Sequence, residues 1–188
     1  MKLDMSFPEL LTEAEAISRD VQFTFGQLNA EQLNWKPSAE SWSVAQCLDH
    51  LISANKEMLS AFDPVIRGSK QTRFLERLPF WSGFWGRMMV KAVSPQGTQK
   101  FKAPTTAVPS SSKLDPQIVG RFVDLQQEVS RKIKAVEGLN PDEVIITSPF
   151  AGFITYSLLD ACRIIVAHER RHFAQAQRVM AAEGFPTA

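Results

Sequence analysis

Cysteine is scarce in this sequence, which argues against chemistry based on cysteine pairs. Only two of the 188 residues are cysteine, and Cys47 and Cys162 are far from the C-x-x-C spacing of redox and zinc sites. Both lie in apolar helical patterns. We therefore expect two buried thiols that pack as small hydrophobic side chains in a reducing cytosol.

Long apolar runs are also missing. No uncharged segment approaches the roughly 18 residues that a membrane span needs. No apolar leader follows Met1, where the chain instead enters an acidic amphipathic pattern. The composition, 44% hydrophobic and 22% charged, is ordinary for a soluble globular protein. We expect one cytoplasmic domain over residues 1–188, with no stable membrane insertion.

The net charge is only +1, but the charges are unevenly distributed. Residues 1–63 contain 4 basic and 10 acidic side chains, whereas residues 64–113 contain 9 basic ones and a single acidic one, Glu76. We do not expect nucleic-acid binding, because the acidic flanks would oppose it and no recognition motif is present.

Apolar residues at three- and four-residue intervals predict four long helices. With their capping and stop signals, these helices cover residues 6–28, 43–67, 115–138 and 155–183. Residues 144–147 are β-branched but isolated, so we expect an extended connector there rather than a sheet. The fold class predicted is all-α, a four-helix bundle with long connections.

Residues 68–113 form a basic, aromatic insert between the second and third helices. An aromatic-rich helical segment is expected first, broken near Pro79 and Gly83, followed by a long loop through Ser112. Three roles are open for this insert: it could cap the open end of the bundle, form a dimer interface, or contact an anionic membrane surface.

Histidine is the other rare residue, and its placement is the most informative feature of the chain. His168 and His172 are four apart in the fourth helix, so both imidazoles lie on one helix face. His50 lies on the second predicted helix and is the only other histidine. Three imidazoles from two helices would form a metal site with open coordination positions, as catalytic metals require.

Residues 168–172 also match H-E-x-x-H, the zinc-protease signature. Only 16 residues follow His172, and the longer form of the motif would need a glycine and a third histidine where Gln175 and Arg178 stand. The sheet that such proteases place beside the motif is also not predicted. We therefore do not expect a peptidase of that class.

Two segments resemble the DinB-like superfamily, also described as YfiT-like metal-dependent hydrolases. Residues 42–51 read WSVAQCLDHL and are similar to the W-S-x-x-x-x-x-x-H start of that family's second helix. Residues 168–175 read HERRHFAQ and resemble its H-x-x-x-H-x-x-Q in the last helix. Trp35-x-Pro37 also looks typical, and the resemblance extends over nearly the whole chain except the 68–113 insert.

The resemblance implies a DinB-type four-helix bundle in which His50, His168 and His172 bind a divalent metal ion. Zinc or nickel is expected most, with iron or manganese as alternatives, because the sequence cannot distinguish them. Many members of the family are homodimers. Characterised relatives include transferases and isomerases that use low-molecular-weight thiols such as bacillithiol, mycothiol or glutathione.

Three functions therefore remain open for this chain. A thiol transferase or a hydrolase would act on a small-molecule substrate, and a non-catalytic, stress-related metal-binding scaffold is the alternative. We prefer the transferase slightly, because no general base is evident on the metal-facing stripe of the sequence.

Other residues are candidates for supporting roles around the histidines. Gln46, Glu57 and Gln175 could orient an imidazole or relay a proton. Glu169 is a weak catalytic candidate, because it is about 100° around the helix from His168, and we expect it to pair with an arginine at the surface. Trp35 and Trp42 are expected to pack at the helix entries rather than to line a pocket.

Overall fold

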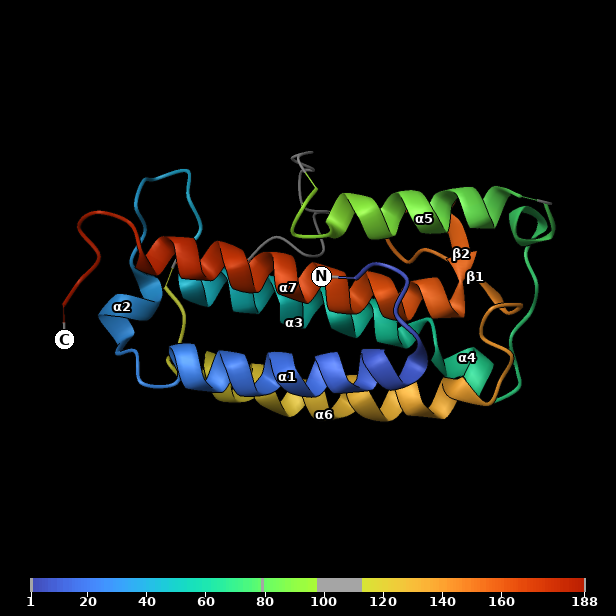
Figure 1. Cartoon of the computed structure of the whole chain (residues 1–188), viewed down its shortest axis with the longest axis horizontal. Helices are drawn as coiled ribbons and strands as arrows, with labels where there is room; N and C mark the ends of the chain where they lie inside the picture. Colours follow the sequence, from blue (N-terminus) through green and yellow to red (C-terminus); the bar gives the residue numbers. More distant parts are fainter. Residues whose placement is uncertain (1, 79, 98–112, 188) are drawn as a thin grey trace.

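Four long helices pack around one hydrophobic core in the computed structural model, which describes residues 2–78, 80–97 and 113–187. The all-α prediction is confirmed, with one small sheet in addition. These helices are α1 (Phe7–Phe25), α3 (Val44–Ser60), α6 (Ile118–Glu137) and α7 (Leu158–Met180). Figure 1 shows α1 beside α6 and α3 beside α7, and each pair also packs against the other.

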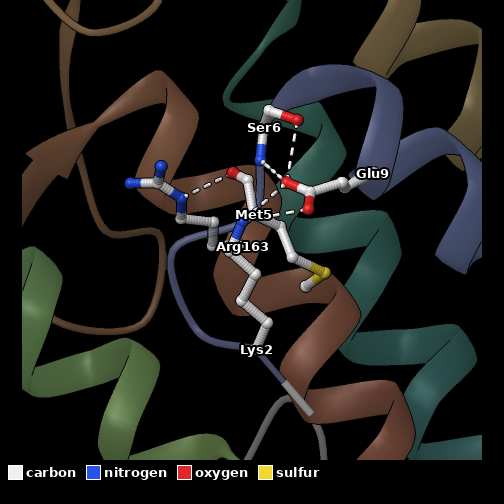
Figure 2. Close-up of polar contacts among 5 residues, drawn as sticks. All are labelled: Lys2, Met5, Ser6, Glu9 and Arg163. Atoms are coloured by element: carbon white, nitrogen blue, oxygen red, sulfur yellow. Dashed lines mark hydrogen bonds and ion pairs between the residues drawn. The ribbon is translucent and has the colours of Figure 1, made fainter.

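The start of α1 is held by the capping residues that the sequence predicts. The Glu9 carboxylate accepts hydrogen bonds from the backbone N–H of Ser6 (2.7 Å) and the amine of Lys2 (2.9 Å), as Figure 2 shows. These bonds lower the pKa of Glu9 to about 2. In the same view, Arg163 of α7 donates from Nε to the carbonyl of Met5, which ties the first helix to the last.

The second predicted helix is shorter than expected at its carboxyl end. Its start is confirmed: Ser43 and Gln46 exchange hydrogen bonds of 3.1 Å in a capping box. It ends at Ser60 rather than near residue 67, and a separate short helix follows, α4 (Asp63–Ile66). Pro64 accounts for the break, because proline has no N–H to donate to the preceding turn.

The third predicted helix begins later than expected. Asp115 and Pro116 form a turn in which the Asp115 carboxylate accepts from the N–H of Gln117 at 2.8 Å, and α6 starts at Ile118. One further short helix, α2 (Ala30–Asn34), lies in the connection between α1 and α3.

The prediction of an unpaired connector at residues 144–147 is wrong. β1 (Ile145–Thr147) pairs antiparallel with β2 (Thr155–Ser157), with Ile146 opposite Tyr156. The fourth helix consequently starts at Leu158 rather than at Thr155, and Ser157 caps it by accepting from the N–H of Asp160 at 3.0 Å. A single β-branched run does not reveal a partner strand that contains only one apolar side chain.

The insert contains a short 3₁₀ turn, η1 (Phe74–Arg77), and one helix, α5 (Trp81–Val93). The expected break near Gly83 is absent, because α5 runs through it. The long loop expected through Ser112 falls mainly on residues 98–112, outside the described residues. In Figure 1, α5 lies along the outside of α7, and it also packs against β2.

Gly86 allows α5 to approach α7 closely, because a Cβ atom there would stand 2.1 Å from the Asp160 carboxylate. Cys47 and Cys162 are free and buried, as predicted, and burial raises the pKa of both thiols. Within the described part of the chain, no helix is long and apolar enough to cross a membrane.

Candidate metal centre

The three histidines meet between α3 and α7. His50 projects from α3, and His168 and His172 project from successive turns of α7, as the four-residue spacing predicts. One ring nitrogen of each lies within 4.8 Å of the other two, and the Nε2 atoms of His50 and His168 are 3.2 Å apart. His50 and His172 are buried and His168 is partly so. The group predicted from the sequence is therefore assembled.

Burial keeps the imidazoles of His168 and His172 neutral. It lowers the pKa of His168 well below its usual value, and the neighbouring His172 and His50 add to the effect. Burial, followed by His50 and Arg171, lowers the pKa of His172 to about 3. Since a metal ion binds neutral imidazole, His168 and His172 are in the protonation state that coordination needs.

The donor set contains nitrogen alone. Among the described residues, no carboxylate or thiol joins the three histidines in a group of this size. Nδ1 of His172 is buried without a hydrogen-bond partner in that part of the chain, and such atoms are uncommon in folded proteins. Three nitrogen donors with no fourth protein ligand fit an ion that keeps coordination positions open, as catalytic zinc does.

Trp42 forms a wall of this site, which the sequence analysis did not expect. Its ring stacks on His172 with the centroids 5.7 Å apart and the planes at 20°, and it lies 5.0 Å from the ring of His50. Trp35, in contrast, packs at 5.5 Å against Phe185 near the carboxyl end, as a packing role predicts. Trp42 precedes the Ser43 cap directly, so the turn that starts α3 also sets the position of the indole.

The prediction that Glu169 pairs with a surface arginine is wrong. Glu169 is fully buried, and its Oε1 accepts hydrogen bonds from Asn55 of α3 at 2.6 Å and Gln126 of α6 at 2.5 Å. Burial raises the pKa of Glu169 to about 7, although both hydrogen bonds act in the opposite direction. The neighbouring Arg170 forms the surface ion pairs instead, with Glu13 and Asp20 of α1.

The reason is that α3 and α6 enclose this position of α7. Asn55 of α3 and Gln126 of α6 reach Glu169, so the buried arc of α7 is wider than one apolar stripe and includes the position next to His168. Asn55 and Gln126 were overlooked, although both occupy apolar-stripe positions, four residues after Leu51 and Phe122 respectively. A polar residue at a position of the apolar stripe was the signal in the sequence that could have indicated a buried polar contact.

The remaining candidates separate by location. Gln46 is buried, and its side-chain oxygen accepts from the N–H of Ser43 in the capping box. Gln175 is partly buried and favours the protonated form of His172, against the larger effect of burial. Glu57 is exposed at the surface of α3, which does not suit the orienting role suggested for it.

Comparison with known proteins shows the family to which the chain belongs. Residues 13–176 match the family described as the DinB superfamily, and the match includes all three histidines. The chain is 24% identical over 152 residues to the uncharacterized protein YuaE of Bacillus subtilis (strain 168), covering 81% of this chain and 85% of that protein. No solved structure matches significantly.

Proposed function

Because the chain belongs to the DinB superfamily, we propose that it binds a catalytic divalent metal ion through His50, His168 and His172. The convergence of three ring nitrogens from α3 and α7 within 4.8 Å carries this proposal. The reaction proposed is a thiol transfer to a small electrophilic molecule, with hydrolysis of a small molecule as the second candidate.

A divalent ion held by neutral ligands keeps its positive charge and lowers the pKa of a coordinated water or thiol. Zinc or nickel is the ion proposed, because imidazole suits both, and iron or manganese would need further oxygen ligands. The residues of this chain hold and orient the ion, and the Trp42 ring restricts access over His172 and His50.

Thiol transfer is favoured because no described carboxylate stands among the histidines as a general base. Hydrolysis needs a group that accepts a proton from the attacking water, whereas a thiol loses its proton more readily. Glu169 is the nearest carboxyl group in sequence, but its Oε1 already accepts hydrogen bonds from Asn55 and Gln126. In the transfer, the thiol sulfur bonds to an electrophilic carbon, and the leaving group departs with the electron pair.

The same proposal includes a homodimer in the cytoplasm. Two buried, unpaired thiols are compatible with a reducing compartment. The dimer rests on the family resemblance, and sedimentation velocity on purified protein tests it directly.

Metal content is the first measurement. The untagged protein, purified without chelators, should contain close to one zinc or nickel ion per chain by plasma mass spectrometry. His168→Ala should lose that metal, and Gln177→Ala, at an exposed position of the same helix, should retain it. A metal-free wild-type protein that takes up neither ion would contradict the proposal.

Activity then distinguishes the candidates. The metal-loaded protein should modify an electrophilic substrate only with bacillithiol, mycothiol or glutathione present, and His168→Ala should not. Full turnover without any thiol would favour the hydrolase. Stoichiometric metal without turnover of either substrate class would favour the non-catalytic scaffold.

A further inference from the structure

The outward face of α5 carries aromatic and cationic side chains together. Its exposed members, here called the α5 face, are Phe80, Phe84, Arg87, Met88 and Lys91. At 100° per residue these positions fall on one side of the helix. The opposite side, with Ser82, Gly86 and Val90, is buried against α7 and β2. In Figure 1, α5 lies on the outside of the molecule, along α7.

The apolar part of this surface continues beyond the helix. Phe80 is 92% exposed and Phe84 is 55% exposed, while Phe74 of η1 and Phe153 before β2 are exposed as well. Phe153 joins α5 directly: its ring lies 5.6 Å from Trp85, and its carbonyl accepts from the Trp81 indole at 3.0 Å. Contiguous exposed aromatic rings of this kind mark interaction sites.

The backbone of Phe80 is strained to present its ring. Its φ is +65°, in the left-handed region that bulky residues rarely adopt, and it stands at the start of α5. Strain of this kind persists where the surrounding structure imposes it, often at functional surfaces.

The charge of this surface is positive and is not neutralised locally. Arg73, which directly precedes η1, and Arg77, within η1, extend the cations of the α5 face, and all of these side chains are exposed. Within the described residues, neither Arg87 nor Lys91 forms a salt bridge. Glu76 is the single acidic residue between positions 64 and 97, and it is buried against Lys70.

We propose that the α5 face binds the surface of an anionic phospholipid bilayer. Phenylalanine rings would enter the headgroup boundary while the arginine and lysine side chains reach the lipid phosphates, the pattern of helices that lie in the interface plane. Each cation near such a surface strengthens binding about fivefold. This interaction is peripheral and uses residues outside the metal centre.

The charge pattern disfavours a second copy of the chain as the occupant. A two-fold dimer would place the same patch against itself. The cations of both copies would then face each other, and no exposed carboxylate between positions 64 and 97 is available to pair with them. A bilayer that contains acidic lipid supplies both the apolar layer and the opposite charge.

Vesicle co-sedimentation tests this proposal on the full-length protein. The wild type should sediment with vesicles of equal phosphatidylcholine and phosphatidylglycerol, and far less with phosphatidylcholine alone. Arg87→Glu with Lys91→Glu should weaken binding by at least about 25-fold, from about fivefold for each cation. Phe80→Ser with Phe84→Ser should weaken it as well, and higher salt should reduce wild-type binding.

Matched controls come from α1, on another part of the surface. Phe23 is 89% exposed, and Arg19 is an exposed cation, so Phe23→Ser and Arg19→Glu make the same chemical changes away from the α5 face. Both should sediment like the wild type. Circular dichroism should show a native helix content for every variant, since all of the altered side chains are exposed.

Three results would overturn the proposal. The wild type could fail to bind acidic vesicles, or the controls could weaken binding as much as the α5 variants. In the third result, the wild type does not bind vesicles and the α5 substitutions have another effect. They either dissociate a dimer in sedimentation velocity or abolish binding of a labelled single-stranded oligonucleotide. That last pattern would assign the surface to a second copy or to nucleic acid.

Discussion

Glu169 is a carboxyl group enclosed by three helices and held by two amide donors. Replacing it with alanine removes the acceptor and leaves Asn55 and Gln126 with buried, unpaired N–H groups. Because such groups and the accompanying cavity are both unfavourable, Glu169→Ala should lower the free energy of unfolding by about 3 kcal/mol. Urea denaturation of the metal-free protein measures this.

The isosteric Glu169→Gln serves as the comparison. Its amide oxygen still accepts from both donors, so its stability should lie within about 1 kcal/mol of the wild type. Equal stability of the alanine and glutamine variants would contradict the arrangement described for Glu169.

Trp42 restricts two of the three imidazoles at once. Removing its ring in Trp42→Ala frees His50 and His172 to rotate, and neighbours that orient metal ligands typically contribute 10- to 100-fold to affinity. Zinc affinity, measured by competition with a chromophoric chelator, should therefore fall by about tenfold or more. Trp35→Ala removes an indole that packs on Phe185 instead and should leave the affinity unchanged.

At the scale of elements, the contact between α5 and α7 depends on a small side chain. In Gly86→Ala the new methyl would meet the Asp160 side chain, whose Cβ is only 3.2 Å away, so the helices would have to separate. We expect a loss of about 1–3 kcal/mol in thermal or urea unfolding.

Gly120 provides the matched substitution on α6. A Cβ added there meets no atom within 4 Å, so Gly120→Ala should gain up to about 1 kcal/mol from helix propensity alone. A loss of stability in Gly86→Ala together with a gain in Gly120→Ala would support the close approach of α5 to α7. A stabilising Gly86→Ala would contradict it.

A buried carboxylate joins η1 to β1. Burial alone would raise the pKa of Glu76, but hydrogen bonds from the Lys70 amine (2.6 Å), the Arg73 N–H and the Thr147 hydroxyl (2.8 Å) outweigh it and hold the pKa below 4.5. The unfolded chain therefore takes up this proton at higher pH than the folded chain. The contribution of the Glu76 carboxylate to the free energy of unfolding is therefore fully present above pH 4.5. It is lost as the pH falls through the folded-state pKa of Glu76.

Glu76→Gln should accordingly destabilise the protein by about 1 kcal/mol at neutral pH, and by progressively less below pH 4.5. Urea unfolding at several pH values checks this. Glu143→Gln, at an exposed position nearby, should show no such trend. If Glu76→Gln destabilised the protein equally at every pH, the hydrogen bonds to an ionised Glu76 carboxylate would be ruled out.

The long helices could be predicted from the sequence because their cause is local. Stripes such as Phe122 and Val129, and caps such as Ser43, act within a few residues of one another. The pairing of Ile146 with Tyr156 depends on a partner strand eight or more residues away, which a short β-branched run does not identify. The break at Pro64, in contrast, has a local cause that the sequence contains.

For the candidate site too, the sequence predicted the features with a local cause and not those that depend on tertiary packing. The spacing of His168 and His172 is a local property of one helix, and the two motifs added His50. The surroundings depend on tertiary packing: the burial of Glu169 results from α3 and α6, which supply Asn55 and Gln126, and the Trp42 stack results from the turn before α3. Neither follows from helical periodicity.

At the scale of the whole molecule, one side chain connects the insert to the histidine helix. Arg171, between the two histidines of α7, donates to the carbonyls of Ala92 (2.8 Å) and Gly97 (3.2 Å) at the end of α5. The surface proposed for lipid and the centre proposed for metal are therefore attached to the same helix. A protein docked through α5 would hold its metal centre at a fixed height above the bilayer.

Metal binding should stabilise the entire fold, because the three ligands come from helices far apart in the chain. A ligand that binds only the folded state at 100 times its dissociation constant adds about 2.7 kcal/mol to the free energy of unfolding. For a chain of 188 residues this raises the melting temperature by about 5–10 °C. Differential scanning calorimetry with zinc or nickel should show the rise, and a chelator should reverse it.

His168→Ala separates this effect from nonspecific binding. It removes one of the three ligands, so its melting temperature should respond little to either ion. Calcium offers a second comparison: it prefers oxygen ligands, and should not shift the wild type because the group contains nitrogen donors alone. An equal rise in the wild type and in His168→Ala would mean that the ion binds elsewhere, and the three histidines would then be core residues without a metal.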